Sequence, residues 1–231
     1  EEAEDFIANV PTGKKPFLAT SCCYSWIMMA QNMFPEIAHC ISDSMTPMVA
    51  TARIIKEKHP NARVVFIAPC ASKKAEGREN PNVDFVWTFR ELDAVIEGME
   101  IDMAACEDFT PEEHAGHDAH GFAKTGGVFT AVKNMVGDPE LQGTLIADLN
   151  KKNIAALRAY AKTGKCPTRM IEVMACPGGC IDGGGTIRAK NNYLDKLDAR
   201  TASIYEIDEK RPIRQSHNNP DVIRLYEEFL E

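Results

Sequence analysis

Apolar and polar residues follow one another along the chain in blocks that predict strands and helices in turn. Apolar runs at residues 15–20, 62–70, 84–89 and 169–175 are typical of short strands. The run ARVVFIAPC at 62–70 is almost continuously apolar, which is typical of a strand that is buried in a parallel sheet. Four strands are therefore expected, each ending near a turn or a cysteine.

Segments with helical periodicity follow these strands. Residues 24–34 predict a helix that stops near Pro35, and Thr46 followed by Pro47 marks the N-terminus of the next one. Further helices are expected from Arg90, at 127–137, at 152–162 and from Pro220. The alternation predicts an α/β fold with mostly parallel sheets flanked by helices.

Composition and charge narrow the class of protein. The 231 residues are enough for one large domain or two lobes, and 44% of them are hydrophobic. A formal net charge of −8 makes nucleic acid and anionic membranes poor partners. No apolar run approaches the roughly 20 residues that span a bilayer, and the acidic opening EEAEDF is unlike a secretory signal. We therefore expect a cytoplasmic protein without membrane insertion.

Cysteine is the residue type that points to chemistry. The eight cysteines are Cys22, Cys23, Cys40, Cys70, Cys106, Cys166, Cys176 and Cys180. A long chain without a secretory signal favours metal binding or redox chemistry over a disulfide framework. Cys23, Cys70 and Cys176 each follow a predicted strand, at the edge where open α/β sheets bind ligands. Cys180 is expected one helical turn after Cys176, with Pro177 in the first helical position.

Glycine surrounds the last two cysteines in the stretch EVMACPGGCIDGGG at 172–185. Such glycines let backbone N–H groups approach a negatively charged group and donate to its sulfurs, which favours an iron–sulfur cluster. The alternative is a structural zinc, which usually shows a short cysteine pair at each end, whereas this chain has only one. Cys22 should point away from Cys23, either as a free thiol or as a small buried apolar side chain.

Other candidate ligands are weaker. HAGHDAH could chelate a divalent metal through His114, His117 and His120, but Gly116 and the nearby acidic residues favour a polar surface loop. The remaining three cysteines have no companions in sequence and are expected to be buried or incidental.

Three stretches resemble the signature motifs of the iron-only ([FeFe]) hydrogenases: TSCCYSW (20–26), APCASKKAE (68–76) and IEVMACPGGCIDGGG (171–185). FPEI, TFREL, TGGV and RQSHNNP extend the resemblance in order across the chain. It implies a two-lobed iron hydrogenase fold with the cluster between the lobes, and one large-subunit catalytic domain over residues 1–231. The implied reaction is reversible formation of H₂ from protons and electrons at an H-cluster. This group is a [4Fe–4S] cubane joined through a cysteine sulfur to a two-iron subcluster with CO, cyanide and azadithiolate.

The resemblance also implies roles for individual residues. The cubane ligands would be Cys23, Cys70, Cys176 and Cys180. The Cys180 sulfur would bridge to the two-iron unit, Cys22 would pass protons to the azadithiolate, and Lys73 would donate to a cyanide. Met174 and Phe122 would pack around the two-iron unit.

A proton path is implied as well. Glu2 and Asp5 fall where the family places carboxylates of this path, and Ser42 falls where it has a relay hydroxyl. Taken alone, Glu2, Asp5 and Lys73 would be read as solvated surface charges.

Departures from the motifs indicate a divergent branch. They are Tyr24-Ser25 after the first cysteine pair, Met48 after Thr46-Pro47, Ala68 in place of Met, Thr186-Ile187 after the last glycines, and Asp5 in place of Glu. Because 21 residues precede Cys22, the N-terminal part of the domain is expected to be absent, reduced or supplied by another chain.

The expected partners follow from the cofactor. The chain has no closely spaced cysteine run of the ferredoxin type, so electrons would come from ferredoxin or from an iron–sulfur partner subunit. The resemblance also implies hydrogenase maturation factors as partners, and nucleic acid is not an expected partner. Two alternatives stay open: a Nar1/Narf-like iron–sulfur assembly protein with a cubane only, and a hydrogen-sensing relative with low turnover. Cys22 favours the enzyme over the assembly protein, which generally lacks that thiol.

Overall fold

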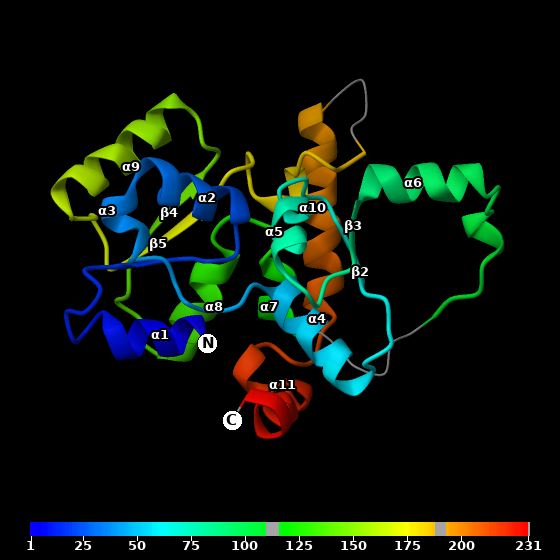
Figure 1. Cartoon of the computed structure of the whole chain (residues 1–231), viewed down its shortest axis with the longest axis horizontal. Coiled ribbons are helices and arrows are strands. Elements are labelled where there is room, and N and C mark those ends of the chain that lie inside the picture. Colours follow the sequence, from blue (N-terminus) through cyan, green and yellow to red (C-terminus); the bar gives the residue numbers. More distant parts are fainter. Residues whose placement is uncertain (110–115, 188–192, 231) are drawn as a thin grey trace.

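The computed structural model describes residues 1–109, 116–187 and 193–230, and every structural statement below concerns these. The strands are β1 (Leu18–Ala19), β2 (Val65–Ala68), β3 (Phe85–Thr88), β4 (Gly143–Ala147) and β5 (Met170–Met174). The helices are α1 (Glu2–Asn9), α2 (Tyr24–Met33), α3 (Pro35–Ala38), α4 (Pro47–Lys58), α5 (Lys73–Glu79), α6 (Phe89–Gly98), α7 (His117–Gly121), α8 (Gly127–Val136), α9 (Lys151–Thr163), α10 (Tyr193–Glu209) and α11 (Pro220–Leu225). Figure 1 shows the two sheets in separate halves of the molecule.

The larger sheet has the order β1-β5-β4 with all pairs parallel. Its central strand β5 is buried at every position, because both faces of the sheet are covered. Ile171 and Val173 pack into one apolar cluster, with residues of α2, α3 and α9. Met170 and Met174 point the other way, into a second cluster with residues of α1 and α8. This alternation is what a central parallel strand requires.

The smaller sheet pairs β2 with β3, also parallel, with Val65 opposite Phe85. The predicted strand at 62–70 is confirmed, but its expected burial is wrong, since Val65 is 38% exposed and Ile67 41% exposed. Phe66 and Val86 pack into an apolar cluster with residues of α4. Because side chains alternate along a strand, Val65 and Ile67 lie on the opposite face and stay partly exposed.

The predicted helices occur as α2, α4, α6, α8 and α9, within one residue of the expected bounds, and the last one occurs as α11 followed by a π-helix at Tyr226–Leu230. Thr46 is at the N-cap position of α4, although its hydroxyl oxygen accepts no N–H of the first turn, and the hydroxyl donates instead to the Glu76 carboxylate. The pattern did not predict β4, α1, α3, α5, α7 or α10, where glycine, charged residues or short length obscure the period. None of the described helices is long and apolar enough to cross a membrane.

Candidate functional site

The four cysteines expected to bind a cluster line one small cavity of about 40 Å³, together with Cys22, Lys73 and Met174. Three of them lie at the end of a secondary-structure element. Cys23 is the N-cap residue of α2, Cys70 lies two residues after β2, and Cys176 lies two residues after β5. The structure thus brings together the thiols that the sequence predicted to meet at strand ends.

The segment from Cys176 to Cys180 is not the helical turn that was expected. Gly178 and Gly179 have φ values of 72° and 110°, and a short 3₁₀ helix begins only at Cys180. A Cβ on Gly179 would lie 2.7 Å from the Thr125 nitrogen and 2.8 Å from the Ala123 oxygen. Glycine is therefore required here both by the backbone conformation and by the close approach of residues 123–125.

The later glycines attach this turn to the loop that carries Cys70. The Gly185 N–H donates to the Pro69 oxygen at 2.8 Å. A Cβ on Gly183 would lie 2.2 Å from that same oxygen. Two ligand-bearing loops from distant parts of the chain are thus held together through backbone atoms alone.

Burial dominates the electrostatics of the thiols. It raises the pKa of Cys180 to about 12, and the neighbouring Cys23 and Cys70 thiols add to the increase. Burial also raises the pKa of Cys23, although backbone N–H groups of Trp26, Ala175 and Ser25 oppose it by donating toward the sulfur. Buried thiols become thiolates when a metal group compensates their charge, so the donor set fits an iron–sulfur cluster.

A structural zinc would need four ligands at about 2.0–2.3 Å from a single point. Among the described residues, no three His, Cys, Asp or Glu side chains converge closely enough to hold one metal ion. The preference for an iron–sulfur cluster over zinc stays a prediction from the sequence.

Cys22 connects the small cavity with a second one of about 240 Å³. Glu2, Ser21 and Phe122 also line this second cavity, so Phe122 lies next to Cys22 but outside the small cavity. Burial raises the pKa of Cys22 well above its usual value, and the carboxylates of Glu2 and Glu172 raise it further.

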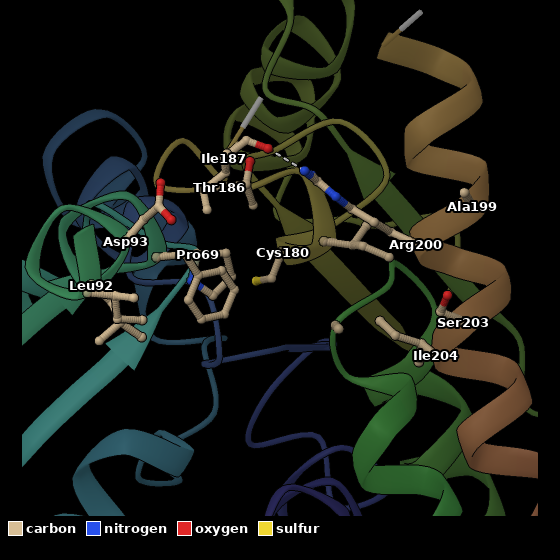
Figure 2. A pocket seen from close by; sticks show the side chains of 14 residues that line it. Pro69, Leu92, Asp93, Cys180, Thr186, Ile187, Ala199, Arg200, Ser203 and Ile204 are labelled. Carbon is tan, nitrogen blue, oxygen red and sulfur yellow. Dashed lines mark hydrogen bonds between the residues drawn. The ribbon is translucent and has the colours of Figure 1, made fainter. Parts of the chain in front are cut away.

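Cys180 also lines two cavities, the small one and an apolar one of about 830 Å³. Figure 2 shows its sulfur pointing into the apolar cavity.

Lys73 is at the first position of α5, and its side chain is nearly buried. Its Nζ lies 2.6 Å from Oε2 of Glu76, which is itself buried. The other Glu76 oxygen accepts from the Thr46 hydroxyl. Glu76 is not among the site residues expected from the sequence, although its position three residues after Lys73 on a helix is a signal for such a pair.

Glu2 is half-buried, and its Oε1 accepts hydrogen bonds from the Ser21 N–H at 2.8 Å and the Ser21 hydroxyl at 2.9 Å. Burial raises the pKa of Glu2, with the Ser21 bonds opposing it. The Ser42 hydroxyl lies 2.8 Å from the Ser44 hydroxyl. In the described part of the chain no hydrogen bond links Glu2, Ser42 and Asp5 to one another.

Asp5 is held by a lysine. Lys15 Nζ lies 2.9 Å from Asp5 Oδ2, and both side chains are only 9% exposed. Lys15 also contacts Asp43 at 3.0 Å, and Asn9 donates to the second Asp5 oxygen at 2.7 Å. Burial would raise the pKa of Asp5, but these hydrogen bonds outweigh it and lower the pKa. A carboxylate held ionised in this way is a poor proton carrier, so its place in the proton path stays a prediction.

We expect Asp5→Asn to lower the free energy of unfolding by about 3 kcal/mol, since it leaves the Lys15 ammonium nearly buried without its main partner. Urea unfolding at neutral pH measures this. The pair stabilises the fold above the unfolded Asp pKa of 3.8, and this contribution is lost as pH falls through the lower folded pKa. Glu57→Gln, at an exposed ion pair, is the control and should change stability by less than about 0.5 kcal/mol. An Asp5→Asn protein as stable as its parent would contradict this structural role.

The histidine segment differs from the surface loop that was expected. His117 and His120 lie on α7 and both direct Nδ1 toward the carboxylate of Asp208 on α10, which is 1% exposed. His114 lies outside the described residues. Among the other cysteines, Cys40 is buried, Cys166 partly buried and Cys106 exposed, away from the small cavity.

Sequence comparisons agree with this site. A family profile described as "Iron only hydrogenase large subunit, C-terminal domain" matches residues 1–184. A second one, "Iron hydrogenase small subunit", matches residues 194–231. All five cysteines that line the small cavity fall within the first match.

Several curated proteins are similar along the chain. Iron hydrogenase 1 of Clostridium pasteurianum is 29% identical, over 100% of this chain and 49% of its own length. The NADP-reducing hydrogenase subunit HndD of Solidesulfovibrio fructosivorans is 31% identical, over 100% and 48%. The cytosolic Fe-S cluster assembly factor narfl of Xenopus tropicalis is 27% identical, over 100% and 60%. The chain thus spans about half the length of the hydrogenases that it matches.

Solved structures show the same fold. An [FeFe]-hydrogenase studied for its inactivation by oxygen superposes with a TM-score of 0.78 at 21% identity, covering 100% of this chain and 77% of that one. The apo [FeFe]-hydrogenase of Chlamydomonas reinhardtii gives 0.77 at 22% identity, covering 100% and 76%. Because the large-subunit profile matches most of the chain and includes every cysteine of the site, the chain belongs to the iron-only hydrogenase family.

Proposed function

We propose that this chain carries the catalytic site of an iron-only hydrogenase, which interconverts H₂ with two protons and two electrons at an H-cluster. One observation carries the proposal: a fifth thiol, Cys22, lines the same cavity as the four cluster cysteines. A scaffold that only stores a cubane needs four thiols. A fifth one, next to a buried carboxylate, is suited to moving protons.

The residues of the chain have distinct tasks in this proposal. Cys23, Cys70, Cys176 and Cys180 would hold the cubane, and Cys180, which lines two cavities, would also help to hold the two-iron unit. When bound, the H-cluster would provide the redox-active centre at which protons and H₂ interconvert. Lys73 would offer a charge-assisted donor to an anionic ligand, kept in place by Glu76.

Protons would reach the site through Cys22. Glu2 lines the second cavity beside it and is the next member of the path. Met174 lines the small cavity and Phe122 the second one, so both would limit water around the site. Ser42 and Asp5 are kept as outer members, although the Lys15 ion pair weighs against Asp5.

Electrons would come from ferredoxin or from an iron–sulfur partner subunit. The similarity to HndD, named as a subunit of an NADP-reducing hydrogenase, supports a partner subunit. The match of residues 194–231 to the small-subunit profile supports the proposal that a small-subunit-like segment belongs to this same chain.

A cubane-only assembly protein is the second candidate, because assembly factors of the Narf type match nearly the whole chain.

Infrared spectroscopy distinguishes the hydrogenase from the assembly protein. After reconstitution with iron and sulfide and addition of a synthetic two-iron complex, we expect CO and cyanide stretching bands that remain after gel filtration. Cys106→Ser, at an exposed thiol, should load like the parent. A protein that holds its cubane but shows no such bands would be an assembly-type scaffold, and the hydrogenase proposal would be withdrawn.

A further inference from the structure

Glu172 is a carboxylate in the middle of the central strand β5, and it is 0% exposed. Its position between Ile171 and Val173 places it on the same face as Met170 and Met174, toward the apolar cluster that includes residues of α1 and α8. A buried charge in such a cluster is costly unless it is fully hydrogen-bonded. Its presence there therefore indicates a specific task.

The partners of Glu172 are backbone N–H groups at the start of α8. Gly126 donates to Oε1 at 2.7 Å and Phe129 donates to Oε2 at 2.8 Å. Gly126 is the N-cap residue, with a φ of 94° and no side chain to cap the helix. Glu172 supplies the missing cap from another element, and its charge is favourable at the positive end of the helix. In the described residues no Lys or Arg side chain forms an ion pair with it.

Residues 121–127, which connect α7 to the first residue of α8, support the turn that carries Cys180. The Thr125 N–H donates to the Gly178 oxygen at 3.0 Å, and the Ile181 N–H donates to the Ala123 oxygen at 2.9 Å. Gly127 is in direct contact with Gly121, since a Cβ on it would lie 1.9 Å from the Gly121 oxygen. The same segment includes Phe122, which packs against the apolar cluster beside Cys22.

These contacts connect Glu172 on β5 to the turn that carries Cys180. Glu172 lies four residues before Cys176 on the strand that leads to it, and its carboxylate holds the segment on which the Cys180 turn rests. We propose that Glu172 is a positioning residue that sets Cys180 relative to Cys176 by anchoring residues 121–127 to strand β5. The consequence for the cluster rests on the proposed function. The contacts of Glu172 themselves are present in the protein without any cluster.

Hydrogen–deuterium exchange on the full chain, before iron is added, tests the anchoring directly. Glu172→Gln keeps the size of the side chain but offers only one acceptor, so one N–H loses its partner. We expect exchange to become about ten-fold faster at residues 122–130 and also at 177–183. Glu172→Asp keeps the charge but is one methylene shorter, and it should show the same two regions of faster exchange. Asp84→Asn, at a carboxylate that accepts from the Val64 N–H in the other sheet, is the matched control and should change neither.

The cluster provides a second readout. In reconstituted protein, electron paramagnetic resonance of the reduced cubane should differ between Glu172→Gln and the parent, and not between Asp84→Asn and the parent. Unchanged exchange at 177–183 in Glu172→Gln, or equally faster exchange throughout α1 and β1, would overturn the proposal. A parent chain that binds no iron would end the proposed function, while the exchange result would still decide the role of Glu172.

Discussion

Cys22→Ala is expected to bind the same number of irons as the parent and to show the same infrared bands, yet to turn over H₂ about 10²–10⁴-fold more slowly. That factor is what a positioned acid–base group usually contributes. The variant removes the one thiol of the cavity that the cubane does not need, and it leaves Glu2 without a neighbour that can exchange protons with the site. Hydrogen evolution with a chemical reductant measures turnover without the natural electron partner.

Two further variants separate proton transfer from loss of structure. Cys22→Asp should retain part of the activity, because a carboxylate can also exchange protons. Cys166→Ala removes a partly buried thiol elsewhere and should keep full activity. If Cys22→Ala turned over as fast as the parent, protons would reach the site by another route and the role of Cys22 would be rejected.

Cys70→Ala should lose most of the iron that the reconstituted parent retains, which is expected to be about four irons per chain. The physical reason is that the loop after β2 carries no cysteine besides Cys70, so no neighbouring thiol can replace it. Iron and sulfide analysis after anaerobic desalting gives the result.

The fold allows this loss to be distinguished from unfolding. The loop around Cys70 is also attached through the Pro69 oxygen to Gly185, a contact that the variant leaves in place. The circular dichroism of Cys70→Ala should therefore match that of the parent before iron is added. A variant that kept four irons, or a parent that bound one zinc and no iron, would contradict the assignment of the ligands.

Much of the site could be predicted because its signals are local. Cys23, Cys70 and Cys176 lie close to the ends of apolar runs, and parallel strands bring such ends to one edge of a sheet. The glycines after Cys176 indicated close backbone approach, which the contacts of Gly179 and Gly183 bear out. The helical turn from Cys176 to Cys180 was wrong, because spacing alone cannot distinguish a helix from a turn with two residues at positive φ.

The sequence by itself determined the α/β class and the family, and it predicted which thiols meet at one site, since each depends on short local stretches of the chain. Only the tertiary structure decided what the charged residues do. Asp5 is held by Lys15, and Glu172 by two N–H groups more than forty residues away. The free energy of a buried charge depends on which distant donors the fold brings to it, and no local pattern contains that information.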